Sequence, residues 1–281
     1  MTVFRNEQEG LRYSISSNNS AIKYFTQQLE EMPFYEFSGD FGTTGAIRAG
    51  YKEIIKLIKL DSKEMRKRIK ELDSEDEENR SIDMPITSLF ADPLILYSRS
   101  DVLSKPCPVP QDRGLYAWFF KEVPPNVPTD GCMTKDGMTL LYVGISPKNE
   151  TSTQNLRKRI TNHYRGNAEG STVRLTLGTL LMEQSDFPLR RVGSGKRMTF
   201  THLGEQWLDD WMEENAFVCW VKHPAPWEVE KEVIESLSLP LNIQDNQHHP
   251  FSRTLSEMRQ EAKRIARGTP ISNESNQQRQ M

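Results

Sequence analysis

Six residues of this chain have side chains whose types suit acid–base chemistry or the binding of a phosphate or a metal ion: Tyr116, Tyr142, Arg159, His163, Glu230 and Asn242. An arginine fork matches the geometry of a phosphate group, and a carboxylate can hold a divalent metal ion. Tyrosine and histidine can hold a water molecule and exchange its protons. Taken singly, each is more typical of ordinary structure, such as a packed strand tyrosine or an acidic residue favouring a helix N-terminus. Only their order and spacing along the chain carry a signal.

The two tyrosines lie in glycine-containing triplets, each within an apolar run. Gly114-Leu115-Tyr116 opens a strand that we expect over 114–120, and Tyr142-Val143-Gly144 lies within a second strand expected over 139–145. The two tyrosines are 26 residues apart. The apolar run 216–221 predicts a third strand, which the same sheet can use.

Helices are expected to present the remaining candidates. The segment 155–164 predicts a basic helix in which Arg159 and His163, four residues apart, lie on one face. Pro226 suits the first turn of a helix that carries Glu230. Thr254 with Glu257 resembles a capping box and predicts the start of a final helix. These elements together indicate an α+β fold.

The chain before these elements has a different character. Residues 1–105 are predicted to be mainly helical, with Ser20 as the cap of one helix and Asp61 opening another. The proline-rich run 105–110 predicts a domain boundary, followed by a second domain over 110–267. Residues 268–281 are polar and are expected to be a disordered tail.

Composition limits the classes of protein that need to be considered. The chain has 281 residues, 36% of them hydrophobic, and it contains no apolar run of membrane-spanning length or leader-like N-terminus. Three cysteines without metal-ligand spacing are typical of free thiols in a reducing compartment, so we expect a cytoplasmic protein without membrane association. No pattern indicates an oligomeric state.

The net charge of -3 hides a local excess of basic residues. Between Arg157 and Arg197, nine basic residues stand against three acidic ones, which is typical of a surface that faces phosphates. A solvated surface with its carboxylates elsewhere in the fold is the alternative. The candidates for nucleic-acid binding are Arg157, Lys158, Arg165, Arg174, Lys196 and Arg197.

In order and spacing, the two triplets, Arg159 with His163, Glu230 and Asn242 resemble the GIY-YIG nuclease superfamily. Leu115 and Val143 stand where that family has isoleucine, and both tyrosines are retained. The resemblance covers roughly residues 110–267, and the stretches 163–172 and 192–197 are similar to a bacterial subgroup of the family. It implies a small three-stranded antiparallel sheet flanked by helices, here preceded by the mainly helical N-terminal region.

The resemblance also implies roles for the candidates. Glu230 would hold Mg²⁺ or Mn²⁺, Arg159 would contact the scissile phosphate, and the tyrosines would position and activate water. Tyr116 would be the candidate general base, with His163 accepting its proton. Asn242 is expected to tie its loop to the strands, and Gly114 and Gly144 to be structural parts of the motif.

The function implied by the resemblance is metal-dependent endonucleolytic cleavage of DNA, most readily double-stranded. Two alternatives stay open. One is a catalytically silent module that binds nucleic acid on the same fold, and the other is a protein-interaction role centred on residues 1–105. Loss of cleavage on removing Glu230 separates the first alternative from a nuclease, and deletion of 1–105 separates the second.

Overall fold

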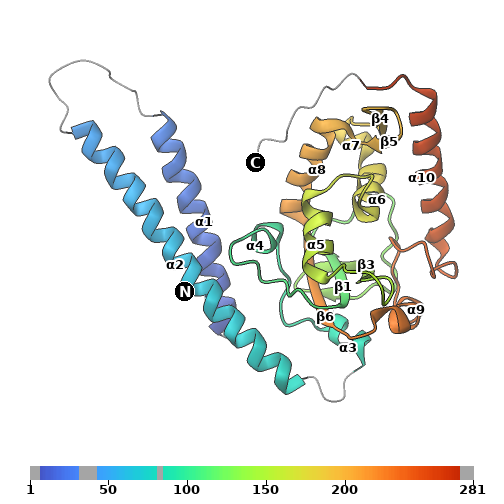
Figure 1. The fold of residues 1–281 in the computed structure, drawn as a ribbon, viewed down its shortest axis with the longest axis horizontal. Helices are drawn as coiled ribbons and strands as arrows, with labels where there is room; N and C mark the ends of the chain where they lie inside the picture. Colours follow the sequence, from blue (N-terminus) through green and yellow to red (C-terminus); the bar gives the residue numbers. More distant parts are fainter. Residues whose placement is uncertain (1–6, 32–42, 81–84, 273–281) are drawn as a thin grey trace. The chain divides into compact units, whose positions relative to one another are not determined.

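The computed structural model describes residues 7–31, 43–80 and 85–272, and it divides the chain into two compact units, residues 1–83 and 84–281 (Figure 1). The first unit is a pair of long helices, α1 (Glu7–Glu31) and α2 (Thr43–Arg80), which pack side by side. The Asn18 amide donates a hydrogen bond to the Asp61 carboxylate between them. The expectation of a mainly helical N-terminal region is confirmed, but Ser20 and Asp61 lie inside the helices rather than at their starts.

The second unit is built on an antiparallel sheet with the strand order β2-β3-β1-β6. Its strands are β1 (Gly114–Phe120), β2 (Thr134–Lys135), β3 (Met138–Ser146) and β6 (Ala216–Lys222). The three predicted strands are therefore confirmed almost residue for residue. The short β2 adds a fourth strand at the edge, beside β3.

The central strand β1 is buried along its whole length because helices cover both faces of the sheet. Side chains alternate across a strand, so Tyr116 and Trp118 pack on one side and Leu115 and Phe119 on the other. The first side is covered by α5 (Leu156–Arg165), α6 (Thr172–Leu180) and α8 (Thr201–Asn215), and the second by α3 (Ile86–Ala91) and α9 (Pro226–Ser236).

The remaining elements lie around this core. They are α4 (Arg99–Val102), α7 (Met182–Ser185), the hairpin of β4 (Arg190–Val192) and β5 (Arg197–Thr199), and α10 (Pro250–Gly268). The last helix begins with His249 as its cap, one turn before the predicted start at Thr254. No helix in the described ranges combines the length and apolarity needed to cross a membrane.

Two predicted boundaries differ from this division of the chain. Residues 85–110 belong to the sheet unit, because Phe90 and Val109 are buried in its cores and Tyr97 pairs with Val218 of the edge strand β6. The predicted tail also starts too early. The Ser272 backbone N–H donates to the Arg191 carbonyl, so 269–272 are held against β4, while 273–281 lie outside the described residues.

Candidate active site

Tyr116 occupies the middle of the sheet, and the glycine opposite makes room for it. The register pairs Tyr116 with Gly144, and a Cβ at position 144 would come within 2.6 Å of the Tyr116 hydroxyl oxygen. Tyr142 lies beside it, with 6.4 Å between the ring centroids. The two triplets therefore form one site, in which Gly144 permits the close approach of a side chain from the neighbouring strand.

Helix α5 brings two of the predicted residues to the Tyr116 hydroxyl. The helix begins at Leu156 because the Asn155 side chain accepts the Lys158 backbone N–H. One helical turn separates Arg159, whose Nε donates to the hydroxyl at 3.3 Å, from His163, whose Nε2 lies 2.9 Å from it. The hydroxyl is thus held between a cation and an imidazole.

Burial sets the protonation states of these groups. It raises the pKa of Tyr116 well above its ordinary value, and Tyr142 adds to the rise while Arg159 opposes it. Burial also lowers the pKa of His163 well below its ordinary value, with the positive charges of Arg159 and Arg174 acting in the same direction. At neutral pH, Tyr116 is therefore protonated and His163 is neutral, so the imidazole can accept a proton.

Ser171, which lies in the 163–172 stretch but was given no role of its own in the sequence analysis, orients the imidazole. Its Oγ lies 2.7 Å from His163 Nδ1 and accepts the Arg174 backbone N–H as the N-cap of α6. If Nδ1 carries the proton and donates to Ser171, then Nε2 is left to accept from Tyr116. The N-cap residue of α6 thereby determines which ring nitrogen of His163 faces Tyr116.

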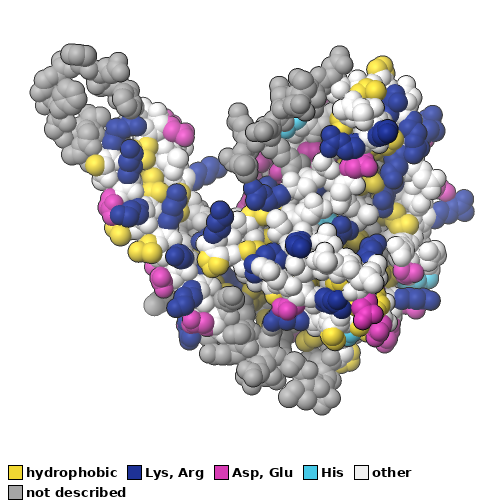
Figure 2. Space-filling view, viewed as in Figure 1, with side chains coloured by type: hydrophobic (Ala, Val, Ile, Leu, Met, Phe, Trp, Pro, Cys, Tyr) yellow, Lys and Arg dark blue, Asp and Glu magenta, His cyan; other side chains and the backbone are white. Residues whose placement is uncertain are grey.

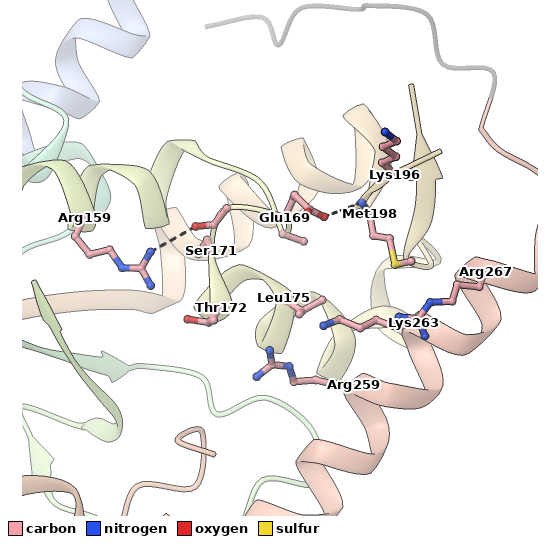
Figure 3. A pocket seen from close by; sticks show the side chains of 12 residues that line it. Arg159, Glu169, Ser171, Thr172, Leu175, Lys196, Met198, Arg259, Lys263 and Arg267 are labelled. Atoms are coloured by element: carbon pink, nitrogen blue, oxygen red, sulfur yellow. Dashed lines mark hydrogen bonds between the residues drawn. The ribbon is translucent and has the colours of Figure 1, made fainter. Parts of the chain in front are cut away.

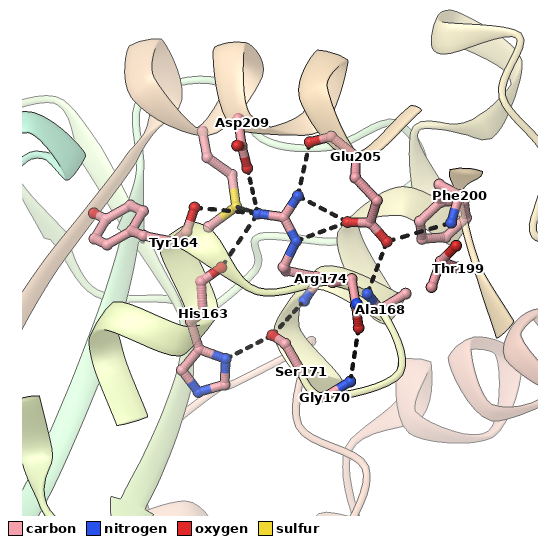
Figure 4. Close-up of polar contacts among 12 residues, drawn as sticks. His163, Tyr164, Ala168, Gly170, Ser171, Arg174, Thr199, Phe200, Glu205 and Asp209 are labelled. Carbon is pink, nitrogen blue, oxygen red and sulfur yellow. Dashed lines mark hydrogen bonds and ion pairs between the residues drawn. The ribbon is translucent and has the colours of Figure 1, made fainter. Parts of the chain in front are cut away.

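Arg174 was expected to contact nucleic acid, but it is fully buried, which corrects that expectation (Figure 4). Its guanidinium pairs with Glu205 at 2.8 Å and with Asp209 at 2.7 Å, both on α8. It also donates to the carbonyls of His163 and Tyr164 at the end of α5. All three nitrogen atoms of the guanidinium donate hydrogen bonds within the fold. Arg174 therefore joins α5, α6 and α8 and cannot reach a phosphate.

Removing the Arg174 guanidinium should be costly to stability. We expect Arg174→Met to lower the free energy of unfolding by about 3–5 kcal/mol, because Glu205 would be left ionised and buried without a cation. Urea denaturation followed by tryptophan fluorescence measures this, since all five tryptophans lie in the second unit. Arg253→Met is the control, because Arg253 is exposed and its pairing with Glu257 is worth little. Equal losses in the two variants would contradict the expected role.

Asn242 behaves as a structural clamp. Its side-chain oxygen accepts the Val143 backbone N–H at 3.0 Å, and its amide donates to the Val143 carbonyl at 2.8 Å. Both bonds are buried and both go to the middle residue of the second triplet. Asn242 therefore acts on β3 as another strand would, because its side chain pairs with both backbone groups of one residue.

Glu230 on α9 acts electrostatically on the same groups. Burial raises the pKa values of Tyr116 and Tyr142, and the charge of Glu230 adds to that rise; for Arg159, where burial lowers the pKa, Glu230 helps to raise it. Burial raises the pKa of the Glu230 carboxyl itself, with Lys148 opposing the shift and Asp245 reinforcing it. Glu230 is therefore a half-buried carboxyl group with both basic and acidic neighbours.

The resemblance implies a bound Mg²⁺ or Mn²⁺, and the oxygen atoms near Glu230 can be compared with the ligands that such an ion prefers. Within the described ranges, no group of three or more His, Cys, Asp or Glu side chains could enclose a metal ion. Glu230, with Asp245 close enough to affect its pKa, supplies hard oxygen atoms. Mg²⁺ is typically bound through one or two carboxylates, keeping water and substrate oxygens as its other ligands, so these residues fit the ion.

The predicted basic residues are not gathered at one place. Arg157 is half-buried and donates to the Val109 carbonyl at 2.6 Å, and the Lys158 amine donates to the Thr153 carbonyl. Arg165 and Arg197 are exposed. Of the predicted set, only Lys196 lines the pocket of about 380 Å³ that opens beside Arg159 (Figure 3).

That pocket also holds cations that the sequence analysis missed. Arg259, Lys263 and Arg267 of α10 line it, opposite Arg159 on α5 (Figure 3). The available signal was their spacing by four, which puts three cations in a row along one helix. The sequence predicted the start of that helix, but the fold was needed to place its cations near Arg159.

Comparisons with known proteins bear on the same part of the chain. A family model described as the GIY-YIG catalytic domain matches residues 114–261, from the start of β1 to the middle of α10. Comparisons with curated proteins and with solved structures gave no significant match. The matched segment contains all six residues from which the sequence analysis began.

Proposed function

The chain belongs to the GIY-YIG nuclease superfamily, and from this premise we propose that it is a metal-dependent endonuclease that hydrolyses phosphodiester bonds in DNA. The observation that carries the proposal is the position of the Tyr116 hydroxyl, 2.9 Å from His163 Nε2 and 3.3 Å from Arg159 Nε. A hydroxyl between a neutral imidazole and a guanidinium can hold a water molecule beside a phosphate and pass a proton onward.

The proton moves in two linked transfers in this mechanism. The attacking water gives a proton to the Tyr116 oxygen while Tyr116 gives its own to His163 Nε2. Because burial raises the pKa of Tyr116, the tyrosine is not a preformed anion, and it can act as a base only if its own proton passes to His163 in the same step.

The phosphate is held by the other side chains. The guanidinium of Arg159 offsets charge on the scissile phosphate, and Tyr142 adds a hydroxyl beside Tyr116. Burial alone would lower the pKa of Arg159, but Tyr116, Tyr142 and Glu230 raise it, so the guanidinium stays charged. Glu230 would hold a divalent metal, which when bound supplies charge stabilisation for the leaving oxygen.

We assign double-stranded DNA as the substrate and the cytoplasm as the compartment. The family resemblance favours DNA, and the cations beside Arg159 favour a phosphate backbone over a neutral ligand. Cys107, Cys132 and Cys219 are free thiols, which suits a reducing compartment.

The proposal is tested by incubating the full chain with supercoiled plasmid, linear duplex DNA and single-stranded RNA, each with Mg²⁺, Mn²⁺ or EDTA. We expect metal-dependent cutting of duplex DNA that EDTA abolishes. Cutting of RNA alone would overturn the substrate assignment. Binding without cutting under every condition would instead support the catalytically silent module.

A further inference from the structure

The pocket beside Arg159 is strongly cationic. Five of its lining residues are basic and one is acidic, and Figure 2 shows Lys and Arg side chains gathered over the region where α10 and the β4–β5 hairpin lie. The acidic residue, Glu169, already accepts the Met198 backbone N–H at 2.9 Å. The pocket therefore presents a positive field with little internal compensation.

The basic side chains on the two sides of helix α10 differ in whether they form ion pairs. Arg253 pairs with Glu257 and Arg264 with Glu261, and these four side chains are exposed. The pocket-lining Arg259, Lys263 and Arg267, by contrast, form no ion pair within the described ranges. Burial lowers the pKa of Arg259, because removing a guanidinium from water carries a cost. An anionic ligand would offset that cost.

The spacing of these cations fits a chain of anions better than a single one. Residues four apart on a helix rise by about 6 Å along its axis, and successive phosphates of a nucleic-acid strand are similarly separated. The row begins near the candidate active site, because Arg259 is close enough to Tyr142 for the tyrosine to affect its pKa. At the other wall, Arg159 lines the pocket while its Nε contacts Tyr116.

The walls are suited to a backbone rather than to bases. Among the residues that the structure describes, no aromatic side chain lines the pocket, so these walls offer no platform on which a base can stack. The N-terminal turn of α6, at Thr172, also opens onto it, and a helix N-terminus favours negative charge. A pocket of about 380 Å³ has room for a short piece of one strand.

We infer that the pocket beside Arg159 binds consecutive phosphates of one nucleic-acid strand, next to the scissile phosphate. The strand runs from Arg159 along the row Arg259, Lys263 and Arg267. The pocket recognises the charge and spacing of its phosphates and not the identity of its bases. This inference rests on the proposed function, because it places the substrate at the same site.

The test compares two double variants of α10 with equal changes in charge. Lys263→Gln/Arg267→Gln removes cations of the pocket, and Arg253→Gln/Arg264→Gln removes paired cations outside it. Both are made with Glu230→Gln and assayed in EDTA, so that binding is measured without cleavage. The probe is a fluorescein-labelled DNA oligonucleotide, single-stranded or duplex, followed by anisotropy over a series of salt concentrations.

We expect the pocket variant to reduce the slope of log K against log salt by about 1.4–1.8, at roughly 0.7–0.9 per lost phosphate contact. The slope for the control should stay within error of the parent. Equal slopes in the two variants would overturn the inference, and so would a mononucleotide that binds as tightly as the oligonucleotide. If the proposed function is wrong, the result is a different one. The Glu230→Gln protein then binds DNA with the expected salt slope, but the wild-type protein never cuts DNA.

Discussion

Glu230→Gln should abolish metal-dependent cleavage while leaving the protein folded. The amide keeps the shape of the side chain but loses the charge that would hold a divalent cation. Losing several kcal/mol of charge stabilisation corresponds to a rate decrease of roughly 10³-fold or more. The variant should still bind DNA, because the cations that line the pocket are unchanged.

The same substitution should not lower the free energy of unfolding. Burial raises the pKa of Glu230, so at neutral pH the folded state holds the ionised carboxylate at a cost that a neutral amide avoids. A second readout follows: MnCl₂ should raise the melting temperature of the wild type but not of Glu230→Gln.

Glu232→Gln is the matched control, since Glu232 is exposed on the same helix two residues away. It should cleave at the wild-type rate and keep the response to MnCl₂. Unimpaired cutting by Glu230→Gln would remove Glu230 from the mechanism. An equal loss in Glu232→Gln would point to a general effect of charge on α9.

Tyr116→Phe is expected to lower the single-turnover cleavage rate by about 10²–10⁴-fold, the range that a positioned proton-transfer group contributes. The substitution removes the oxygen that both Arg159 and His163 contact and keeps the ring in the core. It also leaves the buried His163 Nε2 without its partner, at a cost of about 1–3 kcal/mol in the free energy of unfolding.

The neighbouring core supplies a control for that loss of stability. Tyr164 is also fully buried, but its hydroxyl donates to the Ala216 carbonyl at 2.8 Å, away from Tyr116. Tyr164→Phe should lose comparable stability and keep its cleavage rate. If the two variants lost activity equally, the effect of Tyr116→Phe would be structural and the proton path through Tyr116 would be wrong.

Local patterns predicted the elements that hold the site. The strand at 114–120 was identified from its run of apolar and aromatic residues, and burial on both faces of the sheet explains why that run is uninterrupted. The helix after Asn155 begins where a capping side chain precedes a periodic segment. Contacts within one element or between adjacent strands leave a trace in the spacing of residues.

Contacts between distant elements left no such trace. Arg174 resembled a surface cation because arginine is rarely buried, and its partners Glu205 and Asp209 are 31 and 35 residues farther along the chain. Asp61 resembled a helix start, but within α2 it accepts a hydrogen bond from Asn18 of the paired helix. Tertiary pairing here overrides a local capping signal.

The irregularity in the pairing of β1 with β3 has a consequence for how this domain can change. The register shifts between Trp118 and Phe119, on the side of Tyr116 that leads into the connection between the two strands. Tyr116 and Gly144 lie on the other side of that bulge, where the pairing is regular. Residues can therefore be gained or lost in the connection between β1 and β3, and the mismatch is absorbed before it reaches the pair. We therefore expect an insertion in this segment to leave the pairing of Tyr116 with Gly144 in place.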